Sequence, residues 1–242
     1  MMFGRLLYWL DPVYVEEALP TILASSFFFS LLFLVLWKPV GLGLAEANHV
    51  TAMTHHITAA ALGIYATYAY FGSLNASALA RNSNFPWADS LQRFNVGYIF
   101  YDLGHAIAWE HQFIIHHLIA LAGVGLSDYL GIGALANAVN FWITEVGSLF
   151  YNVYIAFKSK KNYARFVLVY SVSRLVFFVW SLHVLYQVWN HEALFPKEYP
   201  FWCPYCIGML QTLILIVNFS FLSVHIRKLL KQLREDSKNH VD

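Results

Sequence analysis

The stretch ALPTILASSFFFSLLFLVLW, residues 18–37, contains no charged side chain, and Glu17 and Lys38 flank it directly. A helix that crosses about 30 Å of hydrocarbon needs about 20 predominantly apolar residues. This stretch therefore predicts a membrane-spanning helix near the start of the chain. Acidic residues precede it and no convincing small-x-small cleavage site follows it, so we do not interpret it as a cleavable signal sequence.

The composition extends this prediction to the whole chain of 242 residues. Hydrophobic residues make up 59% and charged residues 12%, whereas a soluble domain carries about 25% charged residues. Such hydrophobicity excludes a disordered chain and argues against an ordinary soluble enzyme. The formal net charge of +1 gives no electrostatic footprint for nucleic acid. We expect an all-α, polytopic transmembrane helix bundle.

Further apolar segments bring the expected number of spans to about seven. They are residues Val50–Phe71, Phe94–Trp109, His111–Leu130, Ala134–Phe157, Tyr163–Trp189 and Cys206–Ile226. Residues 94–109 are few for a full crossing, so this span either starts nearer Leu91 or lies in thinned bilayer.

Lysine and arginine gather after alternate spans, which predicts an orientation. These residues are Lys38, Lys158, Lys160, Lys161, Arg165, Arg227, Lys228, Lys231, Arg234 and Lys238. Because cytosolic loops carry the excess of Lys and Arg, we expect a cytosolic C-terminus and a lumenal or extracellular N-terminal tail at residues 1–17. The N-glycosylation sequon Asn75-Ala76-Ser77 then lies on the lumenal side.

Ionisable residues inside the spans point to a polar chamber. A charged group at mid-bilayer costs at least about 2.5–3.5 kcal/mol on insertion scales, so it faces a partner or a cavity. With about 1.5 Å of rise per residue, these groups lie roughly 6–18 Å below the cytosolic face. They are His55, Asp102, His105, His116, His117, Glu145 and Arg174, and Asn152 ends a polar stripe with Asn140, Thr144 and Ser148.

Structural alternatives stay open for the same residues. Arg174 could pair with Glu145 or Asp102 as a buried lock between helices, and the polar stripe could hold helices together. His, Asp and Glu suit a metal, but no span contains an H-E-x-x-H motif, so we expect no metal site. Cys203-Pro-Tyr-Cys206 lacks the βαβ context of a redox motif, which leaves a disulfide or two inert thiols.

Several of these residues occur together in a known family. Phe113-Ile-Ile-His116-His117 resembles the histidine-pair segment of the TLC-domain family, the membrane fold shared with ceramide synthases, and Gly97–Asp102 resembles its glycine–aromatic–x–x–x–Asp segment. His55, Glu145 and Arg174 also stand where such residues recur in the family. The resemblance divides the chain into a first transmembrane helix and linker at 18–45, a TLC-like domain at 46–230 and a cytosolic tail at 231–242.

The resemblance implies a membrane protein of the endoplasmic reticulum or Golgi that acts in lipid metabolism. His116 and His117 become candidates for a catalytic base or acyl-accepting nucleophile, since imidazole titrates near neutral pH. Asp102 becomes the candidate that orients a histidine. His55, His105, Glu145, Asn152 and Arg174 become candidates for a ligand chamber. The implied partner is a membrane lipid or acyl-CoA, the latter as substrate, with no resident cofactor.

The chain departs from the synthase pattern, and three functions follow. Residues 137–152 contain Glu145 but no His-Asp element and no paired Asp, which favours the non-synthase branch. We expect a protein of membrane lipid homeostasis, affecting sphingolipid or phospholipid composition through a chamber that binds lipid or acyl-CoA. The alternatives are a ceramide-synthase-like, acyl-CoA-dependent N-acyltransferase and a non-catalytic cargo-sorting or trafficking protein.

Overall fold

The computed structural model describes residues 16–74, 79, 81–190 and 202–238. Within these ranges the chain forms seven α-helices and no β-strand, so the all-α prediction is confirmed. The helices are α2 (Leu19–Trp37), α3 (Leu44–Ala69), α5 (Pro86–Trp109), α6 (Ile114–Tyr129), α7 (Ala134–Ala156), α8 (Lys160–Trp189) and α9 (Cys203–Lys238). Short 3-10 turns lie between them at η2 (Phe71–Ser73), η3 (Asn82–Asn84) and η4 (His111–Phe113).

The helices follow the apolar segments in order, although α9 runs to Lys238, well past the predicted end at Ile226, and α5 starts earlier than predicted. This helix begins at Pro86, and proline suits the first turn of a helix. The predicted start at Phe94, or nearer Leu91, is too late, because Gln92 and Arg93 interrupt the apolar pattern. Both side chains bond to Asp128 of α6, so polar residues continue the helix inside the bundle.

Among the described residues, three helices are long and apolar enough to cross a membrane. They are Leu19–Trp37, Lys160–Trp189 and the Cys203–Arg234 part of α9. The protein therefore has the character of a membrane protein. α9 continues to Lys238, so the predicted tail begins as a helical extension of the last span.

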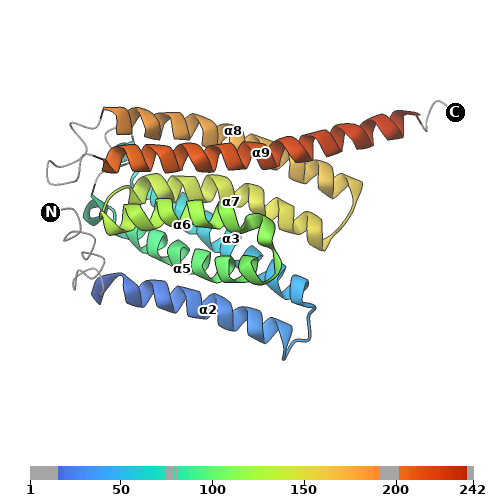
Figure 1. Ribbon diagram of the computed structural model, residues 1–242, viewed down its shortest axis with the longest axis horizontal. Helices are drawn as coiled ribbons and strands as arrows, with labels where there is room; N and C mark the ends of the chain where they lie inside the picture. Colours follow the sequence, from blue (N-terminus) through green and yellow to red (C-terminus); the bar gives the residue numbers. More distant parts are fainter. Residues whose placement is uncertain (1–15, 75–78, 80, 191–201, 239–242) are drawn as a thin grey trace.

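The helices pack as a bundle around α7 (Figure 1). α7 packs against α3 and α8, while α2 packs against α5 and α3 at one edge. α9 contacts both α8 and α6. α6 contacts α5 and α9 but barely touches α7, and this leaves room inside the bundle.

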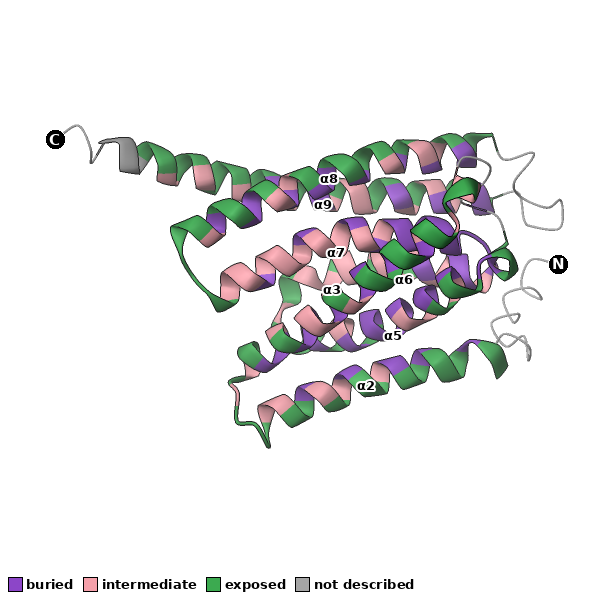
Figure 2. Cartoon of the chain, turned by 180° about the vertical axis from the view of Figure 1, so that it is seen from behind, coloured by how far each residue is buried: buried purple, intermediate pink, exposed green. Residues whose placement is uncertain are grey.

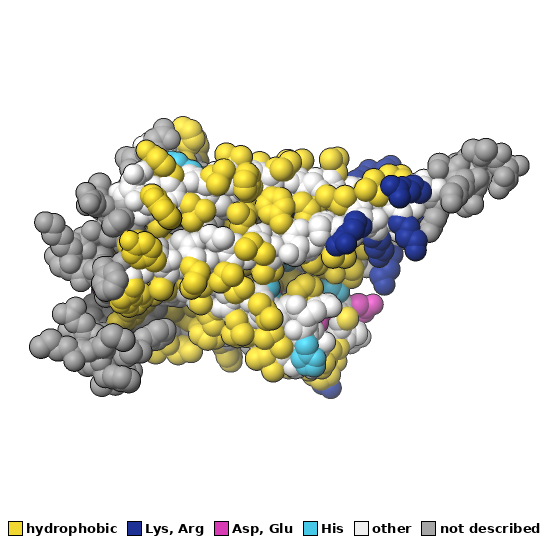
Figure 3. Space-filling view, turned by 45° about the horizontal axis from the view of Figure 1, so that its top comes forward, with side chains coloured by type: hydrophobic (Ala, Val, Ile, Leu, Met, Phe, Trp, Pro, Cys, Tyr) yellow, Lys and Arg dark blue, Asp and Glu magenta, His cyan; other side chains and the backbone are white. Residues whose placement is uncertain are grey.

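The bundle is apolar outside and partly polar inside. Figure 2 shows α2, α8 and α9 with much exposed surface, and Figure 3 shows apolar side chains over the visible face. Phe27 and Leu168 are 68% and 66% exposed, whereas Gln92 and Asn95 are 0% and 1% exposed. Lipid tails would cover such a surface, and polar groups inside it need partners or a ligand.

Two glycines allow the helices to approach closely. A Cβ atom at Gly97 would lie 2.4 Å from the Ile22 carbonyl oxygen of α2. A Cβ atom at Gly147 would lie 2.4 Å from Ser173 Oγ of α8. Gly147 therefore occupies the kind of close helix contact expected from its small size.

The basic residues after α7 and along the end of α9 gather at one end of the bundle. The Tyr163 hydroxyl lies 3.1 Å from His225 Nδ1, which brings the start of α8 beside the later part of α9. Figure 3 shows Lys and Arg side chains concentrated at this end. Below we call it the basic end; the exposed residues are Lys158, Lys160, Lys161, Arg165, Arg227, Lys228, Lys231 and Arg234.

Candidate functional site

A cavity of about 860 Å³ lies between α3, α5, α6, α7, α8 and α9. The cavity exists because α6 packs against α5 and α9 but makes little contact with α7. Apolar residues such as Ile119, Phe177 and Leu210 form much of the wall. Sites for small ligands are typically mostly apolar cavities of about 300–1,000 Å³ with a few polar groups.

A carboxylate–imidazole cluster on the cavity wall joins α3 to α7. Glu145 Oε2 of α7 contacts His56 Nδ1 of α3 directly, and it lies 4.0 Å from His55 Nδ1. The side chains of His55, His56 and Glu145 are only 3%, 11% and 15% exposed. A carboxylate thus faces two imidazoles away from bulk water.

The His55 ring is held on every side. Its Nε2 lies 2.7 Å from Asn95 Oδ1 of α5, and Asn95 Nδ2 donates to the Leu91 carbonyl oxygen. Tyr98 stacks on the ring with centroids 3.5 Å apart and planes at 4°, and Phe29 of α2 meets it edge-on at 5.7 Å. This packing fixes where the remaining nitrogen of His55 points.

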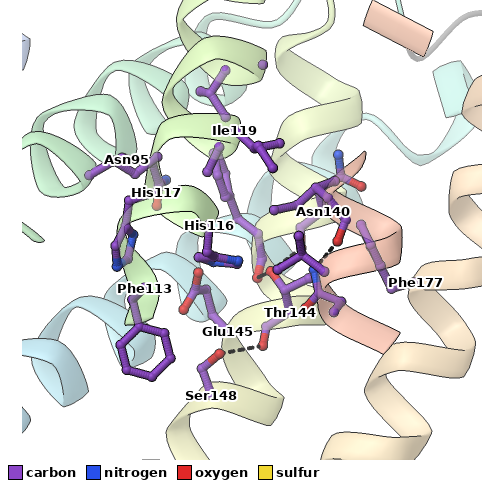
Figure 4. Close-up of a pocket in the computed structure, with 18 of the residues that line it drawn as sticks. Asn95, Phe113, His116, His117, Ile119, Asn140, Thr144, Glu145, Ser148 and Phe177 are labelled. Atoms are coloured by element: carbon purple, nitrogen blue, oxygen red, sulfur yellow. Dashed lines mark hydrogen bonds between the residues drawn. The ribbon is translucent and has the colours of Figure 1, made fainter. Parts of the chain in front are cut away.

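A second carboxylate–histidine pair joins α5 to α6. His117 Nε2 lies 3.3 Å from Asp102 Oδ2, with side chains 14% and 18% exposed. The tight connection through Glu110 and η4 brings the end of α5 to the start of α6. Figure 4 shows His116 and His117 on α6 and Glu145 on α7 projecting into the same space.

Asn152 and Arg174 also line the cavity, with partners of their own. Asn152 Oδ1 lies 2.8 Å from His49 Nδ1, and Asn152 Nδ2 donates to the Ser148 carbonyl oxygen. Arg174 Nη1 donates to the Thr144 carbonyl oxygen at 2.9 Å.

No contact supports the alternative in which Arg174 forms a buried ion pair between helices. Among the ion pairs of the described residues, Arg174 pairs with neither Asp102 nor Glu145. Its guanidinium stacks on the Tyr170 ring at 3.9 Å and also donates to Ser173 Oγ. A positive charge therefore lies near the cavity wall without neutralising the carboxylates directly.

His105 does not line the cavity, contrary to the expectation from its spacing. Its ring meets Phe33 of α2 edge-on at 5.8 Å and lies 4.8 Å from the Trp109 ring. Asp102, three residues earlier, does line the cavity. Residues three apart differ by about 60° around a helix, which is enough to turn His105 toward α2.

Glu110 borders the cavity between α5 and η4, outside the helices. Burial raises the pKa of its carboxyl group, the nearby Asp102 charge raises it further, and His49 opposes the shift.

The sequence predictions gave no role in the site to four residues that shape it: His49, His56, Asn95 and Tyr98. His56 borders the cavity beside His55, and its adjacency to His55 was a usable signal. Neighbours on a helix point about 100° apart, but Glu145 lies between the two rings and meets both. Asn95 carries no charge, and Tyr98 stood out only as the aromatic residue of the Gly97–Asp102 segment, so nothing in the sequence indicated that either supports His55.

The two cysteines do not line the cavity. Cys203 is buried and Cys206 is half-buried, and both are free thiols. Asn75 of the sequon lies outside the described residues.

No family model, no curated protein and no solved structure matches this chain. The TLC resemblance therefore stays a prediction that depends on the residues quoted for it.

Proposed function

We propose that this chain is a seven-span membrane protein that controls membrane lipid composition by binding a lipid or an acyl-CoA in its cavity. The observation that carries the proposal is the cavity itself, with mostly apolar walls and imidazole and carboxylate groups of five helices along it. A ligand with a long apolar chain and a polar head matches both parts of this lining.

Helix lengths and charge support seven spans. α3, α5 and α7 have 26, 24 and 23 residues, which at about 1.5 Å per residue reach across about 30 Å. α6 has 16 residues and is preceded by η4. The concentration of Lys and Arg at the basic end favours a cytosolic placement of that end and of the C-terminus.

The polar groups lie toward the basic end of the cavity. His49, His55 and His56 belong to the first half of α3, and His116 and His117 begin α6. In the proposed orientation, a lipid or acyl-CoA places its polar head near these groups on the cytosolic side and its chain among the apolar residues. The TLC resemblance favours the endoplasmic reticulum or Golgi as the location.

Acyl transfer is the second candidate, and the Asp102–His117 contact favours it. An imidazole nitrogen attacks the thioester carbon of acyl-CoA, the carbon–sulfur bond breaks, and the thiolate leaves and takes a proton. A long-chain amine then attacks the acyl-imidazole, forms an amide and releases the histidine. Asp102 orients the ring and stabilises its charged form.

Lipid extracted from purified protein tests the first proposal. Wild type is expected to carry one enriched lipid class, and the double variant His116→Ala/His117→Ala is expected to lose at least about tenfold of it. His183→Ala is the matched control, because His183 bonds to the Leu74 carbonyl oxygen outside the cavity lining. Equal lipid in all three folded proteins would contradict cavity binding and would favour cargo sorting.

Incubation with long-chain acyl-CoA tests the second proposal on the same proteins. An acyl adduct on wild type that His117→Ala abolishes supports transfer. If folded wild type forms neither adduct nor amide with several chain lengths and amine acceptors, acyl transfer is ruled out while lipid binding stands.

A further inference from the structure

His55, His56 and Glu145 have the geometry of a metal-ion site. Each offers one ligand atom, and these three atoms all lie within 4.8 Å of one another. Around a tetrahedral zinc ion with bonds of about 2.0–2.1 Å, neighbouring ligand atoms lie about 3.3 Å apart. His55 Nδ1 lies 4.0 Å from Glu145 Oε2 and His56 Nδ1 contacts that oxygen directly, so adjustment of the His56 and Glu145 side chains around the fixed His55 ring brings the three atoms to that spacing.

The hydrogen bonds of Asn95 fix the protonation of His55. Asn95 Nδ2 donates to the Leu91 carbonyl oxygen, so Asn95 Oδ1 is the atom that faces His55 Nε2. His55 therefore donates from Nε2 and presents the lone pair of Nδ1. An N–H donated to a fixed acceptor is the usual outer support of a histidine that binds metal through its other nitrogen.

The Nδ1 atom of His55 has no hydrogen-bond partner among the described residues, although it is buried. It faces Glu145 Oε2 across 4.0 Å, so a lone pair and a carboxylate oxygen oppose each other. A proton on Nδ1 would give an ion pair with Glu145 but no hydrogen bond, because 4.0 Å is too long for one. A cation bound to both atoms would resolve it.

The site has three protein ligands on one side and the cavity on the other. His55, His56 and Glu145 all border the cavity, and Figure 4 shows His116 beside the same space. Two imidazoles, one carboxylate and an open position are the donor set of catalytic zinc sites and of non-haem iron(II) sites. The clamped His55 ring makes this arrangement preorganised.

We propose that His55, His56 and Glu145 bind one divalent first-row transition-metal ion, zinc or ferrous iron, with an open coordination position toward the cavity. The expectation of no metal site depended on the lack of a local motif. Here the ligands come from two helices, and His56 and Glu145 are 89 residues apart.

The test uses full-length protein purified in detergent with its affinity tag removed. The protein is equilibrated with Zn²⁺, or anaerobically with Fe²⁺, desalted, and analysed for metal by mass spectrometry. Wild type and His183→Ala are expected to retain about one ion per chain. His55→Ala and Glu145→Gln are expected to retain at least tenfold less, and Asn95→Ala is expected to bind about 10–100-fold more weakly.

Cobalt(II) gives a measurement that needs no variant. Wild type loaded with Co²⁺ is expected to show the visible absorption of a low-coordinate site, which added Zn²⁺ removes. A wild type that retains neither zinc nor iron and gives no such spectrum would overturn the proposal even if every variant misfolds. Retention of equal metal by folded Glu145→Gln would overturn it too. Neither result depends on lipid, so failure here is distinct from failure of the proposed function.

Discussion

Two polar clusters lie inside this bundle, and they differ in how completely their charges are paired. The paired cluster lies at the end opposite the basic end and consists of Asn82, Asp89, Gln92, Arg93, Asp128 and Asn137. The cavity cluster lies toward the basic end and consists of His55, His56, Asp102, His117 and Glu145. Both contain two carboxylates, but only the paired cluster contains an arginine.

The extent of charge pairing indicates a structural role for the paired cluster and a role in ligand binding for the cavity cluster. The Asp128 side chain is 0% exposed, and its Oδ1 accepts hydrogen bonds from Arg93 Nε and Gln92 Nε2, each at 3.3 Å. Arg93 also pairs with Asp89. In the cavity cluster His55 Nδ1 stays without a hydrogen bond among the described residues, and the groups border an open space. Buried charges without full pairing mark a place for a ligand or an ion.

The largest expected effect is on stability, from Asp128→Ala. Removing one member of a buried ion pair leaves the other unpaired, which costs about 3–5 kcal/mol. Asp102→Ala, in the cavity cluster, is expected to cost under about 1 kcal/mol. Denaturant unfolding of both variants in detergent measures the two losses of unfolding free energy. A larger loss for Asp102→Ala than for Asp128→Ala would contradict the distinction between the two clusters.

Gly97→Ala is expected to cost about 1–3 kcal/mol through overpacking. The new Cβ atom would lie 2.4 Å from the Ile22 carbonyl oxygen and 2.6 Å from Ser25 Cβ, so α2 must shift. Because α2 also carries Phe29 against His55, lipid binding should weaken as well.

Gly104→Ala is the control in the same helix, since nothing lies within 4 Å of its Cβ position. It is expected to stabilise the protein by up to about 1 kcal/mol. Equal thermal unfolding of the two alanine variants would show that α2 does not pack on α5 as closely as described.

Tyr101→Phe is expected to cost about 1 kcal/mol. The buried Tyr101 hydroxyl donates to Asn48 Oδ1 at 2.9 Å, so the change leaves an amide oxygen beside the cavity without its donor. Tyr68→Phe, at a tyrosine 81% exposed, should leave the unfolding midpoint unchanged. A midpoint for Tyr101→Phe equal to that of Tyr68→Phe would assign Tyr101 no structural role beside the cavity cluster.

The smallest expected effect is a pH dependence from Glu110, which borders the cavity between α5 and η4. Burial holds the pKa of Glu110 above its ordinary value, so the folded state binds this proton more tightly than the unfolded state does. Stability should therefore fall as pH rises from the ordinary glutamate pKa through the raised one. Glu110→Gln should remove that slope, with an effect of about 0.5 kcal/mol or less. An unchanged slope in denaturant unfolding between pH 4 and 7 would contradict this.

The order of the helices was predictable from the sequence, whereas the direction of a side chain around its helix was not. Apolar runs predicted the order of the helices. Counting residues from the basic ends suggested that Asp102, His117 and Glu145 share one chamber, and all three line the cavity. The same counting placed His105 in the chamber, but its ring faces α2. Rotation around a helix depends on packing partners that a single sequence does not show.

Contacts between residues far apart in the sequence explain the other differences between prediction and structure. Gln92 and Arg93 were predicted to lie just before an apolar span and outside it. Their partner Asp128 is more than thirty residues away in the sequence, so the sequence alone did not show that both side chains are paired inside the bundle. The same holds for His56 and Glu145, which meet only after α3 and α7 pack together. Contacts between helices, rather than local motifs, define both clusters.

Untargeted lipidomics tests the central claim most directly. Cells would express wild type, His116→Ala/His117→Ala or His183→Ala at equal levels in the membrane, beside cells with an empty vector. Wild type and His183→Ala are expected to shift the same lipid class, and the double variant is expected to return that class to the empty-vector level. An equal shift by wild type and the double variant, or no shift by wild type, would contradict a functional cavity.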